Sequence, residues 1–284
     1  MKKRVNESSL RPSSFILHPL KRFGQNFLVD NRIIDRIISA LGPRSDETIV
    51  EIGPGKGALT ARLVEQAGQV VAIEFDRNLV PLLVEKFGAR DNFKLVQADA
   101  LATDFCSHIL PATQARVVAN LPYNISTAIL QRLIDQRHCL GELVLMLQRE
   151  VVDRITAPAG STERGYLSVV VEAYCETEKL FDVAPSAFRP PPKVWSSVIR
   201  LRPDPQIRIE IKDEDSLWKL VSAGFAQRRK TMLNNLRNAP EPLQTKVKHH
   251  GGASVVLCVA GIDLQRRAET LTLAEWAQIA KALE

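Results

Sequence analysis

Short apolar runs alternate with longer amphipathic segments along the middle of the chain, and this alternation is the feature that most limits its fold. The apolar runs are typical of buried strands, and the segments between them have helical spacing. In order, they are TIVEIG, a helix from Leu59, QVVAIEF, a helix from Leu79 to Phe87, FKLVQAD, ARVVAN, a helix from Thr127, and ELVLMLQ. This order predicts βαβ units, a parallel sheet and helices on both faces of that sheet.

The segments on either side of this region have different patterns. Apolar residues recur at helical spacing from Asn31 to Leu41, after a capping Asp30 or Asn31 and before Gly42, which predicts an amphipathic helix. The proline-dense stretch FDVAPSAFRPPPKVWSSVIRLRP has strand-like ends, which we expect to add antiparallel strands at the sheet edge. Beyond Pro203 the alternation stops, and the remaining patterns are mainly helical.

These changes of pattern divide the 284 residues into three parts. We expect residues 1–20 to form a loose, disordered N-terminal arm, residues 21–203 an α/β domain, and residues 204–284 a small helical domain. The 45% of hydrophobic residues can form a sizeable core. No run reaches the roughly 18 apolar residues of a membrane helix, and the first residues contain no signal-peptide core. We therefore expect a cytoplasmic protein that binds no membrane. We also expect it to be a monomer.

The cysteines and the charges bear on cofactors and partners. The cysteines stand singly, without a C-x-x-C pair or a histidine at ligand spacing, so we expect neither a disulfide framework nor a metal site; they are Cys106, Cys139, Cys175 and Cys258. The formal net charge of +6 favours a polyanionic partner. Five basic residues and no acidic one lie between Lys219 and Arg237, although a solvated surface explains such a cluster equally well.

Three consecutive predicted strands end in groups that can bind a ligand. EIGPGKGALT follows the first strand, and its glycines, Gly53, Gly55 and Gly57, permit a tight turn and a close approach to the backbone. Their G-x-G-x-G spacing differs from the G-x-G-x-x-G of dinucleotide folds, which argues against a nicotinamide dehydrogenase. Glu74 ends the second strand and Asp99 ends the third.

These groups are expected to lie together, because ligands of open α/β sheets bind at the carboxyl edge. Glu74 can bind both hydroxyls of a ribose, Asp99 can bind the amine of adenine, and an amino-acid tail can lie over the glycine turn. A nucleoside with such a tail and no phosphate is S-adenosyl-L-methionine. Taken singly, each acid could instead be an exposed loop residue and the glycine turn could serve only packing.

The stretch VVANLPYN ends the fourth strand beside the expected position of the cofactor's methyl group. The side-chain oxygen of Asn120 and the carbonyl of Leu121 could accept the two hydrogens of an adenine amine. Pro122 would hold the turn rigid, and Tyr123 would stack on the base. No strong base is needed, because a sulfonium is already an activated methyl donor. The alternative is a simple strand-ending turn.

Together, these stretches resemble the small-subunit ribosomal RNA adenine dimethyltransferase family. The resemblance runs from Lys21 to about Leu236 and rests on GQNFL, EIGPGKGALT, AIEFD, QADAL, NLPYN, AFRPPPKVWSS and RRKTMLNNL. It implies a Rossmann-like S-adenosylmethionine-dependent methyltransferase sheet. The implied reaction is dimethylation of the exocyclic amine of two adjacent adenines in the 3′-terminal hairpin of small-subunit ribosomal RNA. Immature small subunits would be the partner, with a role in their biogenesis.

The resemblance also implies roles for particular residues. It places in the cofactor pocket Asn26, Leu28, Gly53, Glu74, Asp99 and Asn120, of which Asn26 and Leu28 have no signal in the sequence pattern. It sets Phe188, within F-x-P-x-P-K-V, opposite Tyr123 to sandwich the base. The stretch STERGYLSVV departs from the family pattern, because Gly165 precedes Tyr166, which puts the local substrate loop in question.

Other roles rest on local patterns. We predict that Arg228, Arg229 and Lys230 contact RNA phosphates. For Asn124 and Ser126 the favoured interpretation is a helix cap.

Two other functions are compatible with these patterns. The chain could methylate adenine of large-subunit ribosomal RNA, although RRKTMLNNL and RPPPKVWSS favour the small-subunit type. It could also be a ribosome-assembly or transcription factor that uses the fold mainly to bind nucleic acid. The presence of Gly53, Glu74, Asp99, Asn120 and Tyr123 argues against a loss of catalysis.

Overall fold

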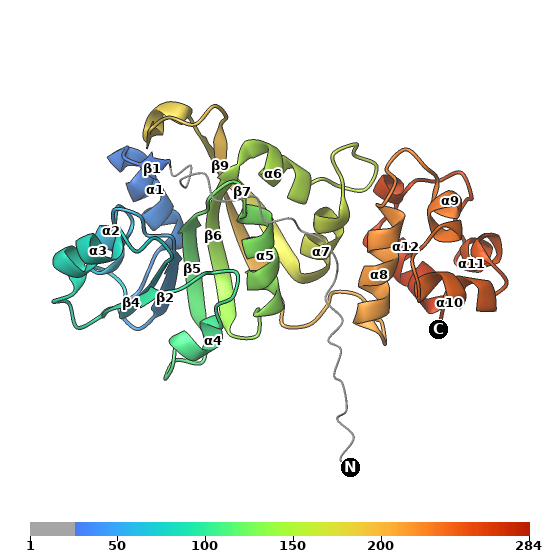
Figure 1. The fold of residues 1–284 in the computed structure, drawn as a ribbon, viewed down its shortest axis with the longest axis horizontal. Helices are drawn as coiled ribbons and strands as arrows, with labels where there is room; N and C mark the ends of the chain where they lie inside the picture. Colours follow the sequence, from blue (N-terminus) through green and yellow to red (C-terminus); the bar gives the residue numbers. More distant parts are fainter. Residues whose placement is uncertain (1–25) are drawn as a thin grey trace, which may run out of the picture.

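The computed structural model describes residues 26–284, so the expected N-terminal arm and the first residues of the predicted α/β domain lie outside the described residues. A seven-stranded sheet has the order β4-β3-β2-β5-β6-β9-β7 (Figure 1). Its strands are β2 (Thr48–Ile52), β3 (Gln69–Glu74), β4 (Phe93–Gln97), β5 (Ala115–Asn120), β6 (Leu140–Gln148), β7 (Cys175–Val183) and β9 (Ser196–Pro203). The first five in spatial order are parallel, and β9 and β7 are antiparallel, as predicted.

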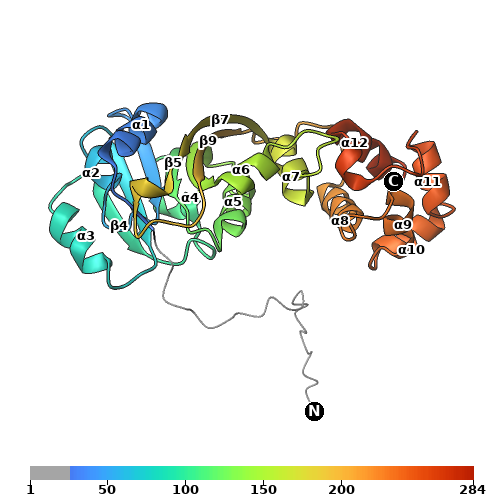
Figure 2. The same ribbon diagram turned by 90° about the horizontal axis from the view of Figure 1, so that it is seen from above.

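Helices cover both faces of this sheet (Figures 1 and 2). One face packs against α1 (Asn31–Leu41), α2 (Thr60–Leu63) and α3 (Val80–Phe87), and the other against α4 (Phe105–His108), α5 (Ser126–Asp135), α6 (Arg149–Ile155) and α7 (Tyr166–Tyr174). Successive strand residues point to opposite faces. Ile49 and Val50 of β2 accordingly belong to two different core clusters. The predicted α/β class is confirmed.

The first helix follows its sequence pattern closely. Asp30 caps α1 by accepting a hydrogen bond from the backbone nitrogen of Arg32, and Gly42 ends it with a left-handed φ of 57°. By contrast, the helix expected from Leu59 is only four residues long, because the chain must turn before it enters β3 at Gln69.

Helices follow the last strand and gather at one end of the molecule, next to α7 (Figures 1 and 2). They are α8 (Glu214–Gly224), α9 (Met232–Arg237), α10 (Leu243–His249), α11 (Ala253–Val259) and α12 (Leu273–Lys281). Trp276 of α12 is fully buried among them. The mainly helical prediction for this part is confirmed, whereas its separation from residues 21–203 as a domain stays a prediction. No helix within residues 26–284 is long and apolar enough to cross a membrane.

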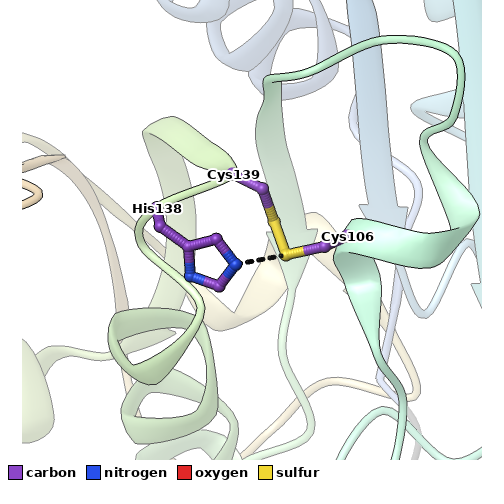
Figure 3. A group of neighbouring side chains, drawn as sticks. All are labelled: Cys106, His138 and Cys139. Atoms are coloured by element: carbon purple, nitrogen blue, oxygen red, sulfur yellow. Dashed lines mark hydrogen bonds between the residues drawn. A yellow bond between two sulfur atoms is a disulfide. The ribbon is translucent and has the colours of Figure 1, made fainter.

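The expectation that the cysteines form no disulfide is wrong. Cys106 of α4 and Cys139, just before β6, are disulfide-bonded across a sequence separation of 33 residues. A histidine is also close, since Nε2 of His138 lies 3.2 Å from Sγ of Cys106 (Figure 3). Single cysteines far apart in the sequence gave no signal of this pairing, because tertiary folding brings α4 beside the turn after α5.

Candidate active site

The turn after β2 places three glycines in the left-handed region of the backbone. Their φ angles are 67° at Gly53, 59° at Gly55 and 82° at Gly57. A Cβ on Gly57 would come within 2.5 Å of the ring of Phe87, and one on Gly55 within 3.2 Å of the ring of Phe27, whereas one on Gly53 would meet nothing within 4 Å. Gly53 therefore borders open space, where a ligand can approach the backbone, and Gly57 serves packing.

Glu74 ends β3 and ties that strand end to the glycine turn. Its Oε2 accepts a hydrogen bond from the backbone nitrogen of Gly55 at 3.1 Å, and its Oε1 accepts one from that of Asp76 at 2.8 Å. Burial raises the pKa of Glu74, and these backbone hydrogen bonds oppose the shift because they favour the charged form. A carboxylate can accept about four hydrogen bonds, so capacity remains for ligand hydroxyls.

A second buried carboxyl, Glu51, lies on β2 just before the glycine turn. Its Oε2 accepts a hydrogen bond from Oγ1 of Thr60 at 2.6 Å. Burial raises the pKa of Glu51 to about 7; the bond from Thr60 opposes the shift, and the charge of Glu74 adds to it. Sequence reasoning missed this residue, although an acid inside the apolar run TIVEI was a usable signal.

A pocket of about 370 Å³ opens at the ends of β3 and β4. Its lining comprises Phe75, Asp76, Arg77, Asn78, Gln97, Ala98 and Asp99. Asp99 is exposed there, and its Oδ1 accepts a hydrogen bond from the backbone nitrogen of Leu101 at 2.9 Å. Phe75 is 51% exposed. An aromatic ring beside a carboxylate suits a planar heterocycle that carries an amino group.

Phe75 was also missed by sequence reasoning. The signal would have been its place directly after Glu74, where an aromatic side chain leaves the carboxyl edge of the sheet.

The end of β5 brings Asn120 beside Asn26. The side-chain nitrogen of Asn120 donates a hydrogen bond to the carbonyl of Asn26 at 3.2 Å. The side-chain oxygen is then the group through which Asn120 can accept a hydrogen bond from a substrate. The next residue, Leu121, is buried and its backbone nitrogen donates to the carbonyl of Met146 at 3.1 Å, which fixes the turn to β6.

Tyr123 is held by the first residue of β9. Its hydroxyl is hydrogen-bonded to Oγ of Ser196 at 2.7 Å, and burial raises the pKa of the phenol. The expected helix cap is wrong: the cap of α5 is Ile125, without a side-chain hydrogen bond, and the hydroxyl of Ser126 donates to the carbonyl of Tyr123 at 3.2 Å.

Trp195, next to Ser196, is a further aromatic residue that the sequence reasoning did not select. It is 45% exposed, and the guanidinium of Arg149 lies 5.8 Å from its ring centroid. The backbone nitrogen of Arg149 donates to the carbonyl of Trp195 at 3.0 Å. Exposed aromatic rings beside arginine are suited to stacking on unpaired bases.

Phe188 lies in a short antiparallel ladder between β1 (Phe27–Leu28) and β8 (Phe188–Arg189), where it pairs with Leu28. Its side chain has no exposed surface and packs in the same core cluster as Leu28 and Ile34 of α1. The described conformation therefore offers no face of this ring to a base, and the sandwich requires the ladder to move. Leu28 is 6% exposed and contributes to the packing beneath the ladder.

The basic triplet lies in the loop between α8 and α9, not on a helix face. A guanidinium nitrogen of Arg228 donates to the carbonyls of Thr162 and Arg164, which precede α7. Arg229 and Lys230 are exposed. Arg228 therefore connects the C-terminal helices to the rest of the protein, a contact that no local pattern indicated.

The stretch around Gly165, which departs from the family pattern, also contributes to the contact between α7 and the C-terminal helices. Arg164 is fully buried, donates to the carbonyl of Ala157 at 3.0 Å and forms an ion pair with Glu172. Tyr166 packs edge-on against Trp218 of α8. The departure from the expected pattern thus affects how α7 meets the C-terminal helices.

The strand order brings most of the predicted pocket together. The strands β4, β3, β2 and β5 are neighbours in the sheet, so the groups at their carboxyl ends lie side by side. In the same order, these groups are Asp99, Glu74, the glycine turn and Asn120. Asn26 joins them through its contact with Asn120. The loop between α8 and α9, which contains the basic triplet, lies at the other end of the molecule from β4 (Figure 1).

Comparisons with known proteins show similar sequences. The family described as ribosomal RNA adenine dimethylase matches residues 18–279. Ribosomal RNA small subunit methyltransferase A of Saccharophagus degradans is 42% identical over 263 residues, which cover 93% of this chain and 94% of that protein. The protein of the same name from Geobacter sulfurreducens is 43% identical, with 93% and 94% covered.

Solved structures share the fold. A dimethyladenosine transferase from Plasmodium falciparum has a TM-score of 0.72 at 24% identity, with 89% of this chain and 95% of that chain covered. The 23S rRNA methyltransferase ErmE has a TM-score of 0.66 at 25% identity, with 91% and 99% covered. These likenesses agree with the Rossmann-like sheet described above.

Proposed function

The chain belongs to the ribosomal RNA adenine dimethylase family, and we propose that the carboxyl edge of its sheet carries out the reaction of that family. The protein is an S-adenosylmethionine-dependent methyltransferase that dimethylates adenine in small-subunit ribosomal RNA. The observation that supports the site most strongly is the Asn120–Tyr123 turn, which follows β5 directly beside the glycine turn of β2.

The residues at this edge fit the cofactor. Gly53 borders open space, Glu74 is a buried carboxylate with acceptor capacity, and Asp99 and Phe75 line one pocket. We propose that Glu74 binds the ribose, that Asp99 binds the adenine amine, and that Asn26, Leu28, Gly53 and Gly55 line the remaining surface. When bound, S-adenosyl-L-methionine supplies a methyl group on a positively charged sulfur, so the acceptor amine needs no strong base.

The turn after β5 would then orient the substrate. Asn120 accepts a hydrogen bond from one amine hydrogen through its side-chain oxygen, and Leu121 accepts one from the other through its carbonyl. These two bonds favour a tetrahedral amine, in which the nitrogen lone pair is no longer delocalised into the adenine ring and can attack the methyl group. Pro122 keeps the turn rigid, and Tyr123 offers its ring to the flipped base. The hydrogen bond between the hydroxyls of Tyr123 and Ser196 holds the Tyr123 ring in place.

We propose that the target is the pair of adjacent adenines in the 3′-terminal hairpin, presented by an immature small subunit in the cytoplasm to a monomeric enzyme. Relatives that are about 42% identical and named for the small subunit support this choice over a large-subunit target. Incubation with labelled S-adenosylmethionine and undermethylated small or large subunits, followed by mapping of the modified nucleosides, tests it. Label confined to large-subunit RNA, or no label with binding retained, would contradict the proposal.

Asp99→Ala should weaken S-adenosylmethionine binding by about 10- to 150-fold, because a charge-assisted hydrogen bond is lost. RNA affinity should stay nearly unchanged, since Asp99 lies in the pocket beside Phe75. Calorimetry with the cofactor measures the first effect. Asp91→Ala is the matched control, because Asp91 is an exposed acid outside the pocket. Unchanged affinity in Asp99→Ala would refute the assignment.

Replacing Arg229 and Lys230 with Ala should weaken the binding of any comparable RNA, whatever its base sequence, because phosphate contacts do not read the bases. The slope of log affinity against log salt should fall by about 0.7–0.9 for each lost phosphate contact. Arg228 is kept in this variant because it bonds to Thr162 and Arg164. Adding Arg228→Ala tests whether it also contacts phosphate. The control is a double variant, Arg62→Ala with Arg90→Ala, which removes the same charge elsewhere and should leave the slope unchanged. If the slope also stays unchanged in the variants of the basic triplet, the triplet is solvated surface and does not contact RNA.

A further inference from the structure

We propose that Cys106, His138 and Cys139 form a redox-gated site for one thiophilic divalent metal ion of the Zn²⁺ type. The site is closed while the two cysteines are disulfide-bonded, and reduction opens it. It lies apart from the cofactor pocket, since Cys139 precedes the first residue of β6 whereas the active site lies where the strands end.

The three side chains are close enough together to act as a ligand set once the S–S bond is open. One ligand atom from each of Cys106, His138 and Cys139 lies within 4.8 Å of the others. Nε2 of His138 is 3.2 Å from Sγ of Cys106, and Figure 3 shows the imidazole directed at the sulfur. Zinc binds thiolate sulfur at about 2.3 Å and imidazole nitrogen at about 2.0–2.1 Å, so a single ion can reach three donors that are this close.

The two cysteine segments are held together without the disulfide. Gln136 is buried, and its side chain accepts a hydrogen bond from the backbone nitrogen of Phe105 at 2.7 Å and donates one to the carbonyl of Thr103 at 2.9 Å. The backbone nitrogen of Cys139 donates to the carbonyl of Gln136 at 3.1 Å. These contacts keep Cys106 and Cys139 adjacent after reduction, so that the ligand set does not depend on the S–S bond.

The chemistry of opening is a thiol–disulfide exchange. A dithiol reductant supplies two electrons and two protons and becomes a disulfide itself, while the S–S bond between Cys106 and Cys139 breaks to give two thiols. The metal ion then replaces the two thiol protons, which pass to solvent. Two thiolates neutralise the charge of a divalent ion, neutral His138 is the third ligand, and water can take the fourth position because His138 is exposed.

Cobalt is a suitable probe, because Co²⁺ takes zinc sites and its thiolate complexes absorb by sulfur-to-metal charge transfer. A phosphine breaks the same S–S bond with one water molecule, whose oxygen ends in the phosphine oxide and whose two protons end on the thiols. We expect the full chain, reduced in this way without oxygen, to develop this absorption up to one equivalent of Co²⁺ and to lose it when Zn²⁺ is added. The oxidised protein should show none. Absence of the band in the reduced protein would overturn the proposal.

Variants identify the ligands. Cys106→Ser and Cys139→Ser should each weaken Co²⁺ binding by more than about 100-fold. Even the loss of a residue that only hydrogen-bonds to a metal ligand typically lowers metal affinity by about 10- to 100-fold. Cys258→Ser, which removes an exposed free cysteine elsewhere, should leave the band unchanged. His138→Gln changes an exposed side chain and should fold normally, yet it should shift the band and weaken binding. Retention of the full band in Cys106→Ser, or its loss in Cys258→Ser, would refute this site.

Discussion

Asn120→Ala should lower the turnover of adenine methylation by about 10²–10³-fold, the usual effect of removing one preorganised hydrogen-bonding group at a reacting centre. The side-chain oxygen of Asn120 is the proposed acceptor for an amine hydrogen, and its side-chain nitrogen is already engaged with the carbonyl of Asn26. Cofactor affinity should change much less, because the lost acceptor acts on the substrate. Single-turnover kinetics with undermethylated small subunits and calorimetry with S-adenosylmethionine separate the two effects.

The matched control is Asn124→Ala, the same substitution at an exposed residue after the turn. It should leave turnover within a few-fold of the unsubstituted protein. Melting temperatures should accompany both variants, since Asn120→Ala also removes the contact with Asn26 that holds β1 near β5. Equal losses of cofactor affinity and turnover in Asn120→Ala would instead make this residue a wall of the cofactor pocket.

Tyr123→Ala should reduce methylation by about 5- to 150-fold, which corresponds to the ~1–3 kcal/mol of stacking on one base. A base in a hairpin must be flipped out to reach the edge of the sheet, at a cost of a few kcal/mol, and stacking offsets part of that cost. Tyr123→Phe keeps the ring and loses only the hydrogen bond to Ser196, so its effect should be mild. Rates of methylation at saturating cofactor measure both. Equal damage by the two variants would show that the hydroxyl, not the ring face, matters.

Phe188 needs a different experiment because its ring is fully buried. Phe188→Ala should destabilise the protein by about 3–5 kcal/mol whatever its role, since it leaves a cavity in the core. Phe188→Leu conserves most of the volume and isolates the ring. If Phe188 stacks on the base, this variant loses methylation at temperatures well below its melting temperature, where it is fully folded. If it is only a core residue, methylation stays unchanged, and the burial of the ring favours this outcome.

The sequence indicated which predicted site residues lie close together, because their positions follow from strand ends, whereas their roles stay predictions. Glu74, Asp99 and Asn120 each stand at the end of an apolar run, and in a parallel sheet such ends meet at one edge. Their proximity therefore needed only the assignment of strands. Phe75 directly follows β3, and Glu51 lies within β2. Neither was predicted as a site residue, because an aromatic after a strand and an acid within a strand have common structural explanations.

The sequence by itself determined the elements, the class of sheet and the residues at its carboxyl edge, because these depend on periodicities of a few residues and on the geometry of parallel strands. Only the tertiary structure decided which distant segments meet. The β1–β8 ladder buries Phe188, the loop before α7 engages Arg228, and the end of α5 brings Cys139 to Cys106. Each of these contacts joins residues whose local patterns are compatible with many partners, and the packing of helices on the sheet selects one.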